Sequence, residues 1–185
     1  MKLKWFGMVA LSTLLMVGCS EESGNSSNEK LSDEYVESAF TELNENTKTP
    51  ENVENGKVSE DYYSEVVRYS TEFLEYEEKM LEFQDKLNKN SSLYQDKGFI
   101  ADYKESLNSY EVFIKSFHLS PKTEADMEIN DNLSDTLLYT SYVISSLRKY
   151  ADTQDSYHTS TLSENMNKRN TSYEAFTNTI KKYDL

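Results

Sequence analysis

The 185-residue chain has only one cysteine, two histidines, two prolines and five glycines. A single cysteine excludes an intramolecular disulfide, and so few thiolate and imidazole groups argue against a zinc site. Proline and glycine are the residues that most often interrupt helices and strands. Their scarcity therefore predicts long uninterrupted elements, and the composition suggests neither a cofactor nor a metal.

The first 18 residues have the organisation of a secretory signal. Lys2 and Lys4 make the start positive, residues 5–17 form a largely apolar run, and the small residue Gly18 follows. A transmembrane helix needs about 20 apolar residues to cross a bilayer, so this run is too short for a permanent anchor. We therefore interpret residues 1–18 as a signal peptide that is removed by cleavage.

The only cysteine comes directly after this segment. Met16-Val17-Gly18-Cys19 resembles the lipobox of bacterial lipoproteins. The resemblance implies that Cys19 becomes the new N-terminus and carries a diacylglycerol on its sulfur. The protein would then be anchored to the extracytoplasmic face of the cell membrane, because two acyl chains give stable attachment. The usage of Asn, Lys, Ser and Tyr favours a Gram-positive host.

The mature chain is expected to be strongly acidic. Removal of residues 1–18 takes away Lys2 and Lys4 and leaves 17 basic and 33 acidic residues, a net charge of −16. A surface of this charge repels nucleic acids and favours cationic partners or divalent ions. We therefore expect no binding to nucleic acid.

Residues 19–30 consist of Cys19 and a polar stretch rich in Ser, Asn and Glu, which predicts a flexible tether. Residues 31–185 remain for one domain. Their apolar residues recur at spacings of three and four, which predicts an all-α fold. We expect helices at residues 31–46, 60–89, 97–117, 124–155 and 161–183, the first of them attached loosely through a polar loop at 47–58.

The expected architecture is an elongated antiparallel bundle of about four to five helices, because short loops make successive helices antiparallel. The apolar seam of helix 60–89 has the heptad spacing of a coiled coil. Ser59 is expected to cap this helix, and Thr123 with Asp126 has the form of a capping box for helix 124–155.

The two histidines do not indicate a catalytic or metal site. His118 lies at the expected end of helix 97–117, where a cation interacts favourably with the helix dipole. Asp155 and His158 give one partial Glu-x-x-His spacing, whereas a di-metal bundle site needs that motif on two helices. The chain also has no G-x-S-x-G nucleophile motif, and we predict that it is not an enzyme.

Residues 126–137 begin like a calcium-binding EF-hand loop. Asp126, Glu128 and Asn130 occupy ligand positions, but Asp131 and Leu137 stand where the motif requires Gly and Glu. We interpret this stretch as helix surface.

Tyrosines recur at intervals of seven residues, at Tyr62, Tyr69 and Tyr76 and again at Tyr103 and Tyr110. Such rings either pack in a core or line a groove that grips a peptide or glycan. Core packing is the preferred interpretation.

Charges on two of the helices raise a further question. Glu75, Glu77, Glu78 and Glu82 form an acidic run, which we interpret as a solvated face, with docking of a basic partner as the alternative. Arg169 interrupts the apolar seam of helix 161–183, and a charge there needs a counter-charge. We expect an acidic residue of a neighbouring helix to supply it.

These features predict a membrane-anchored lipoprotein that acts as a non-catalytic binding or accessory protein for a protein or a cationic peptide. The alternatives are a lipoprotein that binds a small ligand or an ion, and a structural spacer. A concave pocket of roughly several hundred Å³ would favour the ligand binder, whereas an exposed acidic or apolar stripe would favour a protein partner.

Overall fold

The computed structural model describes residues 43, 49–154 and 156–185. The expected signal peptide, Cys19, the tether at 19–30 and most of the expected helix 31–46 lie outside these residues. Leu43, the one described residue of that helix, is helical and buried. The described elements are α2 (Glu51–Glu54), α3 (Glu60–Lys89), the 3₁₀ helix η2 (Ser91–Gln95), α4 (Lys97–Lys115), α5 (Glu124–Thr153) and α6 (Ser156–Lys182).

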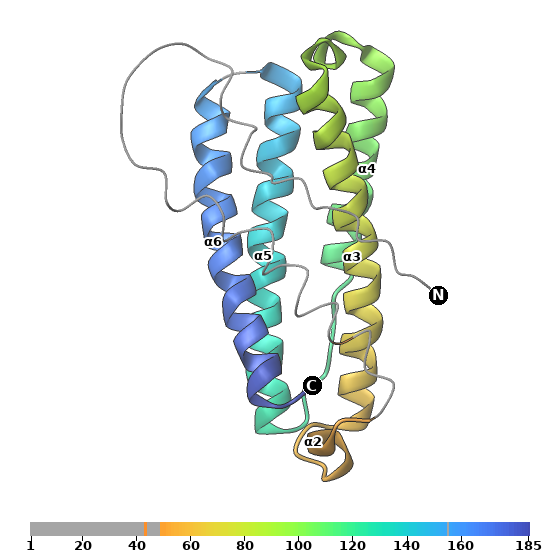
Figure 1. The fold of residues 1–185 in the computed structure, drawn as a ribbon, viewed down its shortest axis with the longest axis vertical. Coiled ribbons are helices and arrows are strands. Elements are labelled where there is room, and N and C mark those ends of the chain that lie inside the picture. Colours follow the sequence, from red (N-terminus) through yellow and green to blue (C-terminus); the bar gives the residue numbers. More distant parts are fainter. Residues whose placement is uncertain (1–42, 44–48, 155) are drawn as a thin grey trace, which may run out of the picture.

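The all-α bundle is confirmed, and the described residues contain no β-strand. Figure 1 shows α3, α4, α5 and α6 side by side along one long axis. The two 30-residue helices α3 and α5 are each about 45 Å long, so the bundle is elongated. One end carries η2 and the turn between α5 and α6, and we call it the loop end; α2 and the C-terminus lie at the other end, which we call the C-terminal end (Figure 1).

The hairpin of α5 and α6 is packed through small side chains. These two helices approach each other over more of their length than any other pair of elements. The buried hydroxyls of Thr140 and Ser146 donate to backbone carbonyls one turn earlier in their own helix, at 2.8 and 2.9 Å. The side-chain amide of Asn132 crosses to the Thr179 hydroxyl at 2.9 Å. Short side chains whose hydroxyls are satisfied within their own helix let the two backbones come close.

The hairpin of α3 and α4 is packed instead through aromatic rings. The ring of Tyr69 stacks on Phe113 with centroids 4.4 Å apart, and Tyr76 stacks on the same ring at 4.9 Å. Phe83 contacts Tyr103 at 5.3 Å. Large rings fill a wider space between helices than Ser and Thr do, and each contributes a large buried apolar area.

Several expected boundaries differ from the structure. The helix expected at 97–117 ends at Lys115, where Ser116 adopts the cap and its hydroxyl donates to the Phe113 carbonyl at 2.7 Å. The last helix begins at Ser156 rather than at 161, and α5 closes at Gln154, which adopts the left-handed region with φ of 52°.

Residues 47–58 were expected to be a polar loop, but they contain the short helix α2. Pro50 precedes this helix with φ of −61°, a value that its ring fixes and that suits a helix start. Val53 and Val58 are buried against the bundle, and this burial rather than local propensity stabilises the turn. The 3₁₀ helix η2 was also not expected.

The capping box of Thr123 and Asp126 is confirmed, since the Thr123 hydroxyl accepts from the Asp126 N–H and the Asp126 carboxylate accepts from the Thr123 N–H. The prediction that Ser59 is the N-cap residue of α3 is confirmed, but its side chain makes no capping hydrogen bond. Its hydroxyl donates to the Asp126 carboxylate instead, which also accepts from the Ser59 N–H at 3.0 Å and the Lys122 N–H at 2.9 Å.

Asp126 therefore joins the start of α3 to the start of α5. Burial alone would raise the pKa of this carboxyl, but donors from Ser59, Lys122 and Thr123 outweigh that effect and hold the pKa below its usual value of 3.8. A lowered pKa in the folded state means that the unfolded chain takes up the proton first as pH falls. The stability contributed by Asp126 is thus complete above pH 3.8 and is lost as pH falls through the lower folded value.

We predict that Asp126→Asn lowers the free energy of unfolding by about 1–3 kcal/mol at pH 7. The amide group of Asn would bring its own N–H donors against the groups of Ser59, Lys122 and Thr123 that donate to the carboxylate. The difference from the wild type should shrink as pH falls below 3.8. Urea titrations followed by circular dichroism at several pH values measure both effects. Asp131→Asn, at an exposed position of the same helix, is the control, and an equal loss in both variants would contradict the role of Asp126.

Candidate functional site

A buried ion pair lies near the middle of the bundle. The Arg169 Nη1 atom on α6 lies 3.3 and 3.4 Å from the two carboxylate oxygens of Glu77 on α3. Their side chains are only 5% and 6% exposed. The expectation that an acidic residue of a neighbouring helix pairs with Arg169 is therefore confirmed.

Two tyrosines complete this arrangement, and we call Glu77, Arg169, Tyr110 and Tyr173 the central cluster. The Tyr110 hydroxyl on α4 donates to Glu77 Oε1 at 2.5 Å. The guanidinium of Arg169 lies over the Tyr173 ring, 5.5 Å from its centroid. Burial and the neighbouring Glu77 charge raise the pKa of both tyrosines well above their ordinary value of 10.0.

The geometry of the central cluster suits stabilisation of the fold. The Glu77 carboxylate accepts from both Arg169 and Tyr110, so one charged group binds helices α3, α4 and α6 together. The ring of Phe73 meets Tyr110 and Tyr173 edge to face, at 5.6 and 5.9 Å, and shields the charges. A molecule could reach these groups only if the helices separated.

The sequence-based prediction for Glu77 is wrong. It was expected on a solvated acidic face, but it is 4% exposed. Its position on the helix could have predicted this burial. Glu77 lies four residues after Phe73 and three before Met80, so it shares a helix face with these two residues, both of which are buried.

The tyrosine seam belongs mainly to the core. Tyr62, Tyr69, Tyr103 and Tyr110 are at most 3% exposed, and Tyr76 is half-buried. The Tyr69 hydroxyl donates to the Phe113 carbonyl at 2.6 Å, which satisfies one polar end inside the bundle. Core packing is thus the interpretation that the structure supports, and these rings do not form an open groove.

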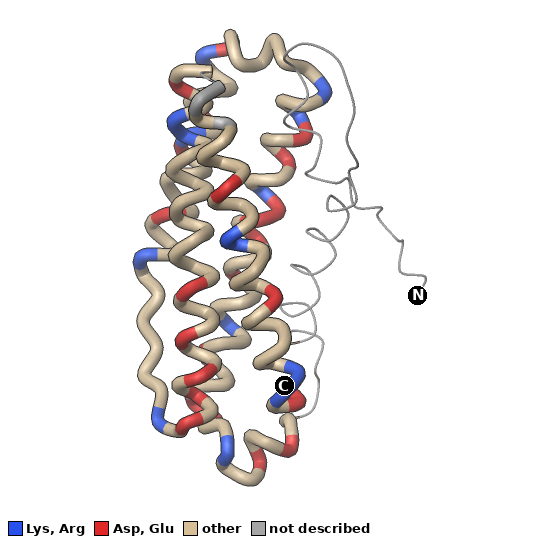
Figure 2. The backbone as a smooth tube through the Cα atoms, turned by 90° about the vertical axis from the view of Figure 1, so that its left-hand side faces the viewer, with Lys and Arg blue, Asp and Glu red and all other residues tan. Residues whose placement is uncertain are grey.

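The rest of the acidic run on α3 faces solvent. Glu75, Glu78 and Glu82 are exposed, and we call them the α3 acidic face. Figure 2 shows that acidic positions occur along the whole bundle. Elsewhere on α3, Arg68 pairs with both Glu65 and Glu72 at 2.7 Å.

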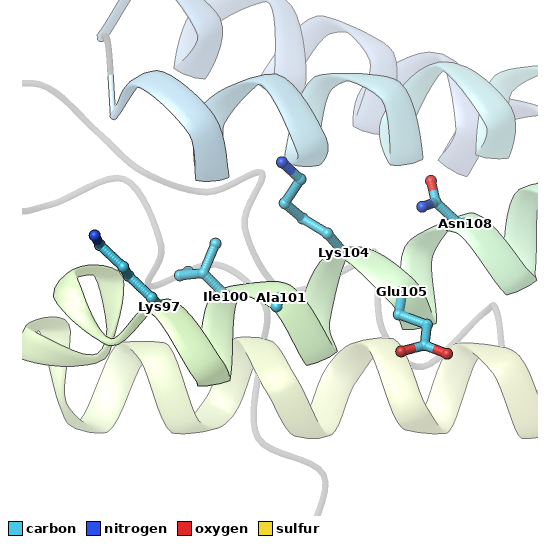
Figure 3. Close-up of a pocket in the computed structure, with 6 residues that line it drawn as sticks. All are labelled: Lys97, Ile100, Ala101, Lys104, Glu105 and Asn108. Atoms are coloured by element: carbon cyan, nitrogen blue, oxygen red, sulfur yellow. The ribbon is translucent and has the colours of Figure 1, made fainter.

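A shallow hollow of about 400 Å³ lies on α4 beside α5. In Figure 3, Ile100, Lys104 and Asn108 point from α4 toward α5, whereas Glu105 points the other way. Lys104 is already paired with Asp152 of α5 at 2.5 Å. The hollow is open to solvent, so it does not enclose a small molecule as typical ligand pockets do.

The histidines lie apart from this hollow and from the central cluster. His118 is exposed in the segment after α4, and His158 is half-buried in the first turn of α6. Asp155, the other residue of the partial metal motif, lies outside the described residues. Nowhere in 43, 49–154 and 156–185 do three His, Cys, Asp or Glu side chains come close enough to hold a metal ion.

The stretch that begins like an EF-hand forms the first turns of α5. It was interpreted as helix surface, which is wrong for Asp126, because this residue is fully buried by the contacts with Ser59. Glu128 remains on the surface side and pairs with Lys182 of α6 at 2.6 Å.

Comparisons with known proteins give no relative. No protein-family model matches the chain, and neither the curated proteins nor the solved structures include a significant match.

We predict that Arg169→Met lowers the free energy of unfolding by about 3–5 kcal/mol, because it leaves the Glu77 charge buried without its counter-charge. The double variant Arg169→Met with Glu77→Met should recover most of that loss, since an apolar pair of similar size replaces the ion pair. Equilibrium denaturation in urea measures all three proteins.

Arg68→Met provides the matched control. Arg68 makes two ion pairs on the exposed side of α3, and exposed pairs contribute only about 0.2–1 kcal/mol. A loss from Arg169→Met as small as that from Arg68→Met would contradict the importance of the buried pair.

Proposed function

We propose that this chain is a bacterial lipoprotein that works at the outer side of the cell membrane as a non-catalytic binding or accessory protein. In this proposal residues 1–18 are the signal peptide, Cys19 carries the diacylglycerol, and residues 19–30 are the tether. The lipobox-like Met16-Val17-Gly18-Cys19 supports the anchor, because it contains the only thiol of the chain. None of the described helices combines the length and apolar character that crossing a bilayer requires.

The binding role is supported by where the aromatic and acidic side chains lie in the bundle. The aromatic seam and the central cluster lie within a packed core, so the exposed surface is left for recognition. That surface includes the α3 acidic face. A protein or cationic peptide with basic side chains is the partner whose charge is complementary.

A small-ligand function finds less support. The hollow on α4 is open, and its lining combines two lysines and Glu105 with Ile100, Ala101 and Asn108. A ligand site usually surrounds most of its ligand, so this surface favours a macromolecular partner.

Crosslinking in intact cells tests the proposal. The full-length protein is treated with a membrane-permeant crosslinker, isolated under denaturing conditions and examined by mass spectrometry, with Cys19→Ala as the variant without an anchor. We expect a membrane-located partner that the wild type captures reproducibly and that Cys19→Ala loses. A wild-type protein that captures no neighbour would contradict a binding role for a macromolecule.

The α3 acidic face is tested in the same assay. We predict that Glu75→Gln, Glu78→Gln and Glu82→Gln together reduce the yield of that crosslink severalfold, because these substitutions remove the charges that steer a basic partner. Glu54→Gln, Glu60→Gln and Glu174→Gln remove the same charge at other exposed positions. Equal crosslinking by both triple variants would show that partner binding does not use the α3 acidic face.

A further inference from the structure

Helix α3 carries a second apolar stripe beside the seam that packs on α4. Tyr63, Val67 and Leu74 each come one position after a residue of that seam, so they lie about 100° further round the helix. All three side chains are half-buried and pack against the core. Tyr69 and Tyr76 of the first seam contact α4. The second stripe therefore faces away from α4 and offers α3 another packing surface.

Helix α6 has a buried side that is turned away from α5. Thr179 contacts Asn132 of α5, and Thr177 lies two positions earlier, on the opposite side of the helix. Thr177 is only 1% exposed, and Asn170 lies two turns before it on the same side. Thr177 Oγ1 and Asn170 Oδ1 are both buried, and neither has a hydrogen-bond partner among the described residues. An element other than α5 therefore covers this side of α6.

Helices α3 and α6 do not cover each other by close backbone packing. Within the described residues, close backbone approach joins α5 with α6, α4 with α5 and α3 with α4, and α3 with α6 is not among these pairs. The two helices meet through long side chains instead, Glu77 with Arg169 and the ring of Phe73 with that of Tyr173. This wider spacing leaves a surface on which another helix can pack. We call it the α3–α6 face and define it by Tyr63, Val67, Leu74, Met166, Asn170 and Thr177.

The position of Leu43 indicates what covers the α3–α6 face. Leu43 is helical and 1% exposed, and it lies six positions before residue 49. At about 3.3 Å per residue, six positions span at most about 20 Å, so Leu43 is buried near α2 and the C-terminal end. Tyr63 and Val67 belong to the first turns of α3, next to α2. The helix that contains Leu43 is therefore within reach of this part of the α3–α6 face.

The residues before Leu43 have the pattern of an amphipathic helix. Val36, Ala39 and Phe40 lie seven, four and three positions before Leu43, so a helix places all four apolar side chains on one face. Glu34 falls on the opposite face of the same helix. Because Leu43 is buried, its side of the helix is the one that we expect to pack against the bundle.

We propose that residues 31–43 form a helix whose apolar side docks on the α3–α6 face as a further helix of the bundle. Such a helix is about 20 Å long, close to the roughly 17 Å that separates Tyr63 from Leu74 on α3. The docking depends on packing and does not require the lipid anchor. Where Cys19 is acylated, the docked helix leaves only residues 19–30 as free tether, about 40 Å at full extension, and so holds the bundle close to the bilayer.

Thiol crosslinking tests the docking. The chain from residue 19 onward with Cys19→Ser has no thiol of its own, so cysteines can be introduced in chosen pairs. Ala39→Cys, a small change on the apolar side of the segment, is combined in turn with Val67→Cys on α3 and with Asn170→Cys on α6. Each folded protein is treated with a short bis-methanethiosulfonate reagent, and the intramolecular crosslink is identified by mass spectrometry after digestion.

Two control pairs place the second cysteine outside the α3–α6 face. Val112→Cys on α4 and Asp131→Cys on α5 are at exposed positions and are each combined with Ala39→Cys. We expect severalfold higher yields of crosslink from the pairs with Val67→Cys and Asn170→Cys than from these controls. Equal yields from all four pairs, or higher yields from the controls, would overturn the inference.

Substitutions within the segment test whether its apolar side makes the contact. Val36→Gln with Phe40→Gln should abolish the preference for the α3–α6 face, because these changes place polar groups against an apolar surface. Glu34→Gln with Thr41→Gln changes the opposite side of the helix and should preserve the preference. Loss of the preference in both double variants, or its survival in both, would overturn docking through the apolar side.

The crosslinking experiment is independent of the proposed function, because the protein it uses carries no lipid. A chain that cells do not acylate would overturn the proposed function and leave the crosslinks unchanged. A chain that cells acylate, but whose residue 39 shows no preference for the α3–α6 face, would overturn only the docking.

Discussion

The bundle depends on the buried ion pair between Arg169 of α6 and Glu77 of α3. Neither charge is tolerable in the interior without the other, so α3 and α6 have one axial register in which both are satisfied. Tyr110 brings α4 into the same contact by donating to Glu77. The fourth helix, α5, is held to α6 along its length by small, hydrogen-bonded side chains. One polar interaction in the centre thus constrains how two differently packed hairpins come together.

This construction bears on what the molecule can do. Its aromatic residues fill the wide space between α3 and α4, and its charged residues other than the central pair lie mostly outside. The proposed activity therefore relies on the distribution of surface charge. The α3 acidic face, with Glu75, Glu78 and Glu82 exposed, suits recognition of basic partners.

Much of the fold could be predicted from the sequence because the signals are local and repeated. The start of α5 follows from the capping box of Thr123 and Asp126. The extent of α3 follows from eight apolar positions at alternating spacings of four and three: Tyr62, Val66, Tyr69, Phe73, Tyr76, Met80, Phe83 and Leu87. The need of Arg169 for a counter-charge also follows from its place in an apolar seam. The identity of that partner could not be predicted, because Glu77 lies within a run of four glutamates and only the packing of the helices shows which of them is buried. Likewise, Ser59 is a residue type that commonly caps helices, but its hydroxyl donates to Asp126, which is distant along the chain and could not be identified from local sequence. Helix α2 depends on the burial of Val53, which no local pattern shows.

The membrane anchor is the claim on which location and binding role both rest, and the intact mass of the protein tests it most directly. The full-length chain is expressed in a Gram-positive bacterium, extracted from the membrane fraction with detergent and measured by mass spectrometry without digestion. The account predicts a chain that begins at Cys19 and carries the added mass of a diacylglycerol. A chain that retains residues 1–18, or one that begins elsewhere and carries no lipid, would contradict it.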